Sequence, residues 1–136
     1  MAIEDESVKD RDIWTEVARG WYLKVSNRQP SIGRLYHHLA ILARPDALQQ
    51  LFYYAKSFCV SMPFPSARDS IMTLLEPVFQ SQPTKELLDI DTAFIRVHGV
   101  LFSGNHKDEL QPSLDAFVEQ LPRRLDEADK EWLQNG

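Results

Sequence analysis

The chain has 136 residues, a formal net charge of −5, 43% hydrophobic residues and 26% charged residues, which excludes a disordered chain and suits one domain with a buried core. Its one cysteine excludes an internal disulfide, and no apolar run approaches the roughly 20 residues that cross a bilayer. An intracellular location without membrane association is therefore expected.

The first predicted helix covers residues 12–25, where apolar side chains recur every three or four positions. Asp12 is the expected N-cap, with Asp10 as the alternative. Residues 1–11 are predicted to form an acidic N-terminal tail. The remainder, 12–134, is predicted to form a single helical domain.

Two further helices are predicted in the middle of the chain, over residues 32–44 and from Asp46 onward. Pro45 ends the first because the residue before a proline disfavours the helical region. Asp46 is the expected N-cap of the second, which stops before Pro63. Cys59 falls on the apolar stripe of that helix, so we expect a buried structural thiol.

Three more helices complete the chain. One covers residues 66–80, and the next runs from its expected cap, Thr84, to residue 102. A Ser-Gly-Asn turn follows at 103–105. The last helix starts near residue 107 or 112 and ends near residue 133, and Pro122 should bend or split it.

No segment shows the alternating pattern of a strand, and short loops between successive helices imply antiparallel hairpins. The predicted fold class is therefore all-α, built of antiparallel helical hairpins. The second and third helices resemble a degenerate tetratricopeptide unit with a closing proline, so the chain is predicted to be a fragment of a tetratricopeptide-like α-α superhelix.

The sequence offers no catalytic or metal-binding constellation. His37 and His38 are adjacent, so on a helix they point about 100° apart and do not readily share one metal ion. No His-Glu-x-x-His pattern, paired cysteines or phosphate loop is present. We therefore expect no enzyme activity, no catalytic residues, no cofactor and no metal.

Charge is unevenly distributed along the chain. Residues 1–16 contain six acids and two bases, residues 17–75 contain seven bases and two acids, and residues 83–136 contain eleven acids and six bases. The basic middle could bind phosphate of a nucleic acid or of a phosphorylated peptide, or could be an ordinary solvated face. The candidate phosphate-binding residues are Arg34, His37, His38, Arg44, Lys56 and Arg68.

A series of short motifs occurs in a fixed order. It comprises Trp21-Tyr22, Pro-x-x-Gly at 30–33, Tyr-His-His-Leu-Ala at 36–40, Tyr-Tyr at 53–54 and Pro-Phe-x-x-Ala at 63–67. This order resembles the DNA/RNA-binding domain of the Ever Shorter Telomeres family. That family includes telomerase-associated subunits and the Smg-type adaptors of nonsense-mediated mRNA decay. The Tyr-His-His-Leu-Ala motif is similar to that of filamentous-fungal members.

The resemblance implies a tetratricopeptide-like helical fold and a non-catalytic adaptor in the nucleus, the cytoplasm or both. Its implied partners are proteins of a telomerase or mRNA-decay complex, and RNA or single-stranded telomeric DNA. Only sixteen residues precede the match, so we expect a truncated member or a fragment, which could self-associate through exposed apolar surface. The alternative is a truncated helical-repeat protein that binds a protein partner through an apolar groove and has no nucleic-acid role.

Overall fold

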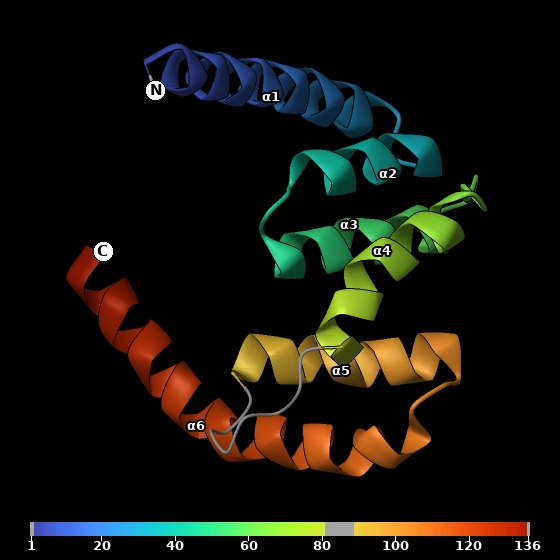
Figure 1. Cartoon of the computed structure of the whole chain (residues 1–136), viewed down its shortest axis with the longest axis vertical. Helices are drawn as coiled ribbons and strands as arrows, with labels where there is room; N and C mark the ends of the chain where they lie inside the picture. Colours follow the sequence, from blue (N-terminus) through green and yellow to red (C-terminus); the bar gives the residue numbers. More distant parts are fainter. Residues whose placement is uncertain (1, 81–88, 136) are drawn as a thin grey trace. The chain divides into compact units, whose positions relative to one another are not determined.

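The computed structural model describes residues 2–80 and 89–135, with side chains described from residue 7 onward (Figure 1). This part of the chain is helical apart from short loops and one isolated β-bridge, which confirms the all-α class. By its internal contacts the chain divides into two compact units, Met1–Leu74 and Leu75–Gly136, which are described separately. The elements are α1 (Ala2–Arg28), α2 (Gly33–Leu42), α3 (Ala47–Cys59), α4 (Ala67–Gln80), α5 (Ile90–Ser103), the 3₁₀ helix η1 (Lys107–Glu109) and α6 (Leu110–Asn135).

Helix α1 begins at Ala2, so the predicted helix start at Asp12 is wrong, and residues 2–11 belong to the helix. Residues 2–11 are mostly Glu, Asp, Lys and Arg, with few apolar residues, so apolar periodicity gives no signal there. Glutamate and lysine are nevertheless good helix formers, and acidic residues near a helix N-terminus interact favourably with the helix dipole. Both effects favour an early start.

Helices α2 and α3 form a hairpin that a short backbone pairing closes. Met62 donates its N–H to the Ser31 carbonyl at 2.9 Å, and Gly33 donates to the Met62 carbonyl at 2.8 Å. A Cβ at position 33 would lie 2.5 Å from the Ser57 carbonyl oxygen, so only glycine fits there. The Pro-x-x-Gly motif therefore marks the point where the loop after α3 crosses the start of α2.

The core of unit 1 lies among α2, α3 and the first turns of α4. The Asp46 carboxylate accepts the Gln49 N–H at 3.1 Å, which confirms Asp46 as the N-cap of α3. Cys59 is exposed at the last position of α3, so the prediction of a buried thiol is wrong. The buried apolar side chains are Tyr36, Leu39, Ala40, Ala43, Leu51, Tyr54, Ala67, Ile71 and Leu74.

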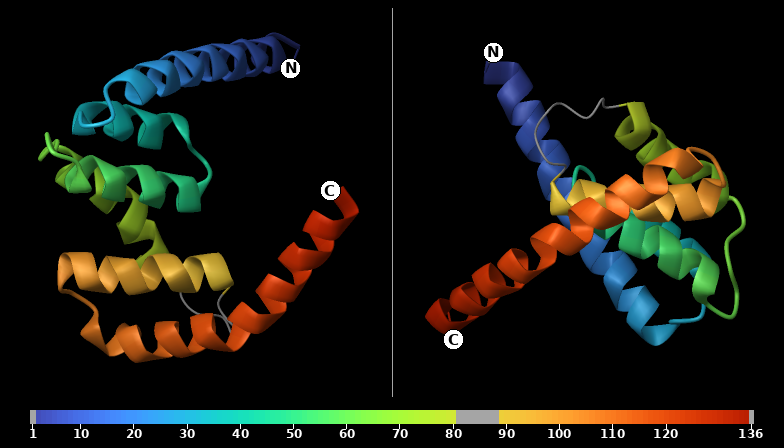
Figure 2. Two further views of the ribbon diagram at one scale, coloured as in Figure 1. Left: turned by 180° about the vertical axis from the view of Figure 1, so that it is seen from behind. Right: turned by 90° about the horizontal axis from the view of Figure 1, so that it is seen from below.

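Unit 2 is built on the α5–α6 hairpin (Figure 2). Gly104 ends α5 in the left-handed conformation, as the predicted turn requires, and η1 leads into α6. Pro122 lies inside α6, which stays one helix and bends partway along its length (Figure 2). The expected cap of α5, Thr84, lies outside the described residues, and α5 begins at Ile90.

Buried Arg96 ties the elements of unit 2 together. Its Nε donates to the Val78 carbonyl at 3.1 Å, and its Nη1 lies 3.9 Å from Glu109 Oε2. Gly99 allows the Phe79 ring to approach α5, since a Cβ there would lie 2.8 Å from it. Among the described helices, none is both long and apolar enough to span a membrane.

Candidate nucleic-acid interface

Three of the six candidate residues share one face of α2. Arg34, His37 and His38 are separated by three and four positions, so they are neighbours on the helix surface. Arg34 is exposed, whereas both histidines are half-buried. Arg34 is a permanent cation beside these rings, and its charge contributes to lowering the pKa of both histidines. The lowered pKa favours the neutral form of each ring.

His37, although half-buried, packs against α3, α4 and the loop between them. Its Nε2 lies 3.0 Å from Ser70 Oγ of α4, and its ring packs 5.0 Å from the Phe64 ring and 6.0 Å from the Tyr54 ring, centroid to centroid. Burial lowers the pKa of His37 below its ordinary value of 6.5, with further contributions from His38 and Arg34. A neutral ring in this setting acts first as a packing residue.

His38 joins α2 to α1. Its ring stacks on Tyr22, with centroids 5.0 Å apart and planes 23° apart. Burial lowers the pKa of His38, and the Arg34 charge lowers it further. Nearby, Arg19 Nη2 donates to the Leu42 carbonyl at 3.3 Å, so α1 is fastened to both halves of α2.

Lys56 lies in a different environment, beside aromatic rings. Its Nζ is 4.7 Å from the centroid of the Tyr36 ring and 5.6 Å from that of Phe52. The Tyr36 hydroxyl donates to the Pro30 carbonyl at 2.9 Å, which fixes that ring. Because residues two apart on a helix point about 200° apart, Lys56 over Tyr36 lies on a different side of α2 from Arg34.

Arg44 and Arg68 complete the predicted set. Arg44 is exposed just after the end of α2, and Arg68 is exposed in the first turn of α4, two residues before Ser70. The structure therefore brings Arg34 together with the two histidines and pairs Lys56 with Tyr36. The candidate residues therefore lie on more than one side of α2. Phosphate binding by any of them stays a prediction.

Sequence reasoning missed the contacts that three residues make in this region: Tyr22, Tyr36 and Ser70. Each acts through a contact between different helices, so helical spacing within one segment carries no signal for it. The Trp21-Tyr22 motif and the Tyr-His-His-Leu-Ala motif did single out the two tyrosines, although not their contacts.

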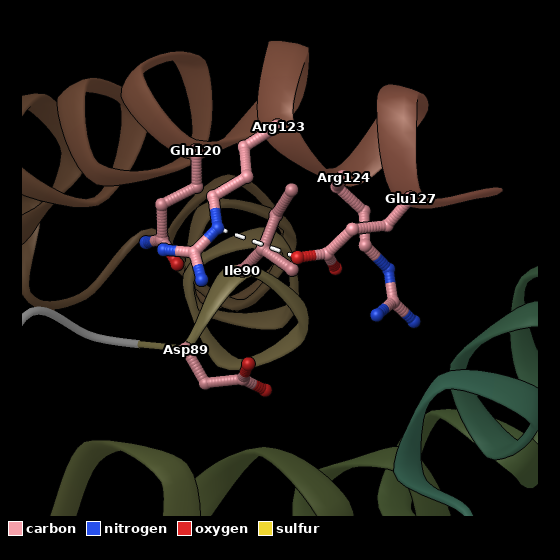
Figure 3. A pocket seen from close by; sticks show the side chains of 6 residues that line it. All are labelled: Asp89, Ile90, Gln120, Arg123, Arg124 and Glu127. Atoms are coloured by element: carbon pink, nitrogen blue, oxygen red, sulfur yellow. Dashed lines mark hydrogen bonds and ion pairs between the residues drawn. The ribbon is translucent and has the colours of Figure 1, made fainter. Parts of the chain in front are cut away.

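A charged hollow occurs in unit 2 (Figure 3). Arg123 Nε lies 3.3 Å from Glu127 Oε1 across one turn of α6, at a largely exposed position. Two carboxylates thus accompany two guanidinium groups, so the hollow does not favour an anion. Its lining residues are Asp89, Ile90, Gln120, Arg123, Arg124 and Glu127. Among the described residues, no three His, Cys, Asp or Glu side chains gather closely enough to hold a metal ion.

Packed helical hairpins, formed by α2 with α3 and by α5 with α6, place the chain in the class of all-α helical-hairpin domains. Residues 18–134 match the Est1 DNA/RNA binding domain. The chain therefore belongs to the family that this domain defines, as the order of the motifs predicted.

Two relatives from Danio rerio show the same kinship. The chain is 33% identical over 117 residues to "Nonsense-mediated mRNA decay factor SMG7", an alignment that covers 82% of this chain and 10% of that protein. It is 41% identical over 61 residues to "Telomerase-binding protein EST1A", covering 43% of this chain and 4% of that protein. The chain thus spans about a tenth of these relatives or less. A filamentous-fungal origin stays a prediction.

Proposed function

We propose that this chain is a non-catalytic adaptor module of the telomerase-associated or nonsense-mediated-decay type. It binds protein partners, and it binds RNA or single-stranded DNA through the basic residues of α2 and α3. The observation that carries the nucleic-acid part is Lys56, an exposed cation whose Nζ lies 5.6 Å from the centroid of the Phe52 ring, itself 58% exposed. The membership of the family named for DNA/RNA binding supports it.

The physical argument combines charge with stacking. Residues 17–75 hold seven bases and two acids, although the whole chain is acidic. Lysine and arginine bind phosphates and release counterions, while aromatic rings accept unstacked bases regardless of sequence. Lys56 beside the exposed Phe52 ring offers both features, and Arg34 offers a second phosphate contact on another side of α2.

The test is fluorescence anisotropy with single-stranded RNA and with G-rich DNA, at low and at physiological salt. Because Arg34 and Lys56 lie on different sides, Arg34→Glu and Lys56→Glu are measured separately and together. We expect the variant that removes a phosphate contact to bind about tenfold more weakly and to reduce the salt slope by about one. Lys130→Glu on exposed α6 is the matched control.

Wild-type-like binding by the double variant would reject the basic residues of α2 and α3 as the nucleic-acid site. Binding that ignores salt would reject phosphate contacts altogether. Because each single variant reports on one side of α2, the same titrations also show which side binds.

The assignment to an adaptor leads to proposals about its partners, its location and its need for a cofactor. The partners are proteins of a telomerase or mRNA-decay complex, by analogy with the names of the two relatives. The location is intracellular, nuclear or cytoplasmic. The module requires no cofactor, since it works by binding alone.

A second candidate function is protein binding through an apolar groove, without nucleic acid. A shallow groove on α3 favours it, because Phe52 and Leu48 line it and are 58% and 40% exposed. Asp46, Gln49 and Tyr53 complete its lining. Absence of binding to both nucleic acids at low salt would favour this function over the first.

A further inference from the structure

Helix α1 carries an apolar stripe that its packing in unit 1 does not cover. Trp14 is 69% exposed, Trp21 63% and Val17 43%. The opposite side of the helix faces α2, through Tyr22 and Arg19 (Figure 1). Two tryptophans and a valine in water on one helix face are costly, so this stripe marks an interaction surface.

The stripe follows the spacing of a coiled-coil seam. Residues 10, 14, 17, 21, 24 and 28 are separated alternately by four and three positions, which is the a/d pattern of a heptad repeat. The six residues are Asp10, Trp14, Val17, Trp21, Lys24 and Arg28. Ile13 and Val25, 59% and 39% exposed, lie at the edges of this seam.

The two ends of α1 carry opposite charge. Residues 2–16 contain six acids and two bases, whereas residues 17–28 contain three bases and no acid. Two such helices side by side in parallel would place like charges together. In the antiparallel orientation the acidic half of each helix lies against the basic half of the other, which lowers the electrostatic energy.

We propose that the α1 seam binds a second copy of this chain in an antiparallel two-helix interface. The two-fold axis passes between the two helices at the level of position 19, midway along the seam. In this register Asp10 faces the partner's Arg28, Trp14 faces the partner's Lys24, and Val17 faces the partner's Trp21. Every layer then joins an acid to a base, a ring to a cation, or two apolar side chains. This proposal does not rest on the proposed function.

The self-complementarity of the seam is the reason for choosing a second copy as the occupant. A two-fold interface requires that one surface match itself, so that each contact occurs twice. Moving the register by one heptad toward the N-terminus would place Asp10 against the partner's Trp21 and lose both acid–base layers. One register therefore satisfies all six seam positions at once.

The experiment is sedimentation equilibrium of the full chain, with a charge-exchange set of variants. We expect a concentration-dependent dimer for the wild-type chain. Asp10→Arg should weaken it about tenfold, because each copy then sets two cations against each other. Asp10→Arg combined with Arg28→Asp should restore the wild-type affinity. Asp12→Arg, with the same change in charge at an exposed position off the seam, should leave the dimer unchanged.

The apolar layers are tested with Trp14→Ser and Trp21→Ser together, which should weaken the dimer by at least about a hundredfold. Far-ultraviolet circular dichroism of each variant checks that α1 stays helical. A monomer at every concentration would overturn the proposal. A dimer indifferent to the tryptophan variants, or one that the charge exchange does not restore, would also overturn it.

Discussion

Gly33 is the residue on which the α2–α3 hairpin closes. A Cβ there would lie 2.5 Å from the Ser57 carbonyl oxygen, 2.7 Å from the Phe64 nitrogen and 2.9 Å from the Met62 carbonyl oxygen. All three are backbone atoms, so none can rotate away. We expect Gly33→Ala to lower the free energy of unfolding by about 1–3 kcal/mol, as overpacking of a well-packed site does. Urea unfolding followed by circular dichroism measures it.

The matched control for this change is Gly20, which lies inside α1 at a position where a Cβ would have no atom within 4 Å. Alanine is the better helix former, so Gly20→Ala should raise the free energy of unfolding by about 0.5–1 kcal/mol. Equal effects of the two substitutions would show that backbone contact at Gly33 does not matter.

His37 makes the stability of unit 1 depend on pH. Its pKa is lowered in the folded chain, by burial first and then by His38 and Arg34, from an ordinary value of 6.5. The unfolded chain therefore binds more protons than the folded chain as the pH falls below 6.5. The stabilisation is complete above that value and is lost as the pH falls through the lowered pKa.

The expected result is a free energy of unfolding that falls as the pH is lowered through 6.5. His37→Gln cannot be protonated in this range, so it should reduce this dependence and leave the part that is due to His38. Urea unfolding at several pH values compares the two proteins. His98→Gln, at an exposed position where the ring bonds to its own helix, is the control. An unchanged slope for His37→Gln would count against the assignment.

At the scale of the element, residues that end or cap helices made the middle helices predictable. Pro45, Asp46 and Pro63 interrupt strong apolar periodicity, and α2, α3 and α4 all begin within a residue or two of their predicted starts. The start of α1 was not predictable in this way. Its first turns hold few apolar residues, so their helicity comes from propensity and charge rather than from a packed face.

The capping role of Asp46 at the start of α3 can be tested directly. The Asp46 side chain accepts the Gln49 N–H at 3.1 Å, so Asp46→Ala should lower the free energy of unfolding by about 1 kcal/mol. Asp12 was also expected to be a cap but lies inside α1, where Asp12→Ala should cost nothing, since alanine favours the helix. Thermal unfolding of both variants measures the two changes. An equal loss of stability in both variants would show that Asp46 does not act as a cap.

The candidate site was less predictable than the helices that carry it. Arg34, His37 and His38 belong to one helix, so their spacing in the sequence already implies that they are neighbours. Spacing could not show that Lys56 lies over Tyr36, on another side of α2, because that depends on how two helices pack. The bond between His37 and Ser70 spans 33 positions and left no local signal.

At the scale of the whole molecule, the acidic total conceals a basic middle. The chain carries −5, yet residues 17–75 hold five more bases than acids. Fields of this kind act on encounter with a charged ligand and are screened within about 10 Å at ordinary salt. The acids of α1 that precede the basic segment should therefore oppose nucleic-acid binding, and they should do so at low salt only.

Neutralising two of these acids tests the whole-molecule argument. Asp12→Asn with Glu16→Gln removes two negative charges from exposed positions of α1 while leaving the predicted phosphate-binding residues intact. We expect the affinity for single-stranded RNA to rise about twofold at low salt and to match the wild-type value at high salt, because screening removes a through-space effect. Anisotropy titrations at both salt concentrations measure it, with the uncharged exchange Ser7→Asn on the same helix as control. A gain that persists at high salt would point to a local rearrangement of α1 instead. No gain at low salt would mean that the basic segment does not meet the nucleic acid.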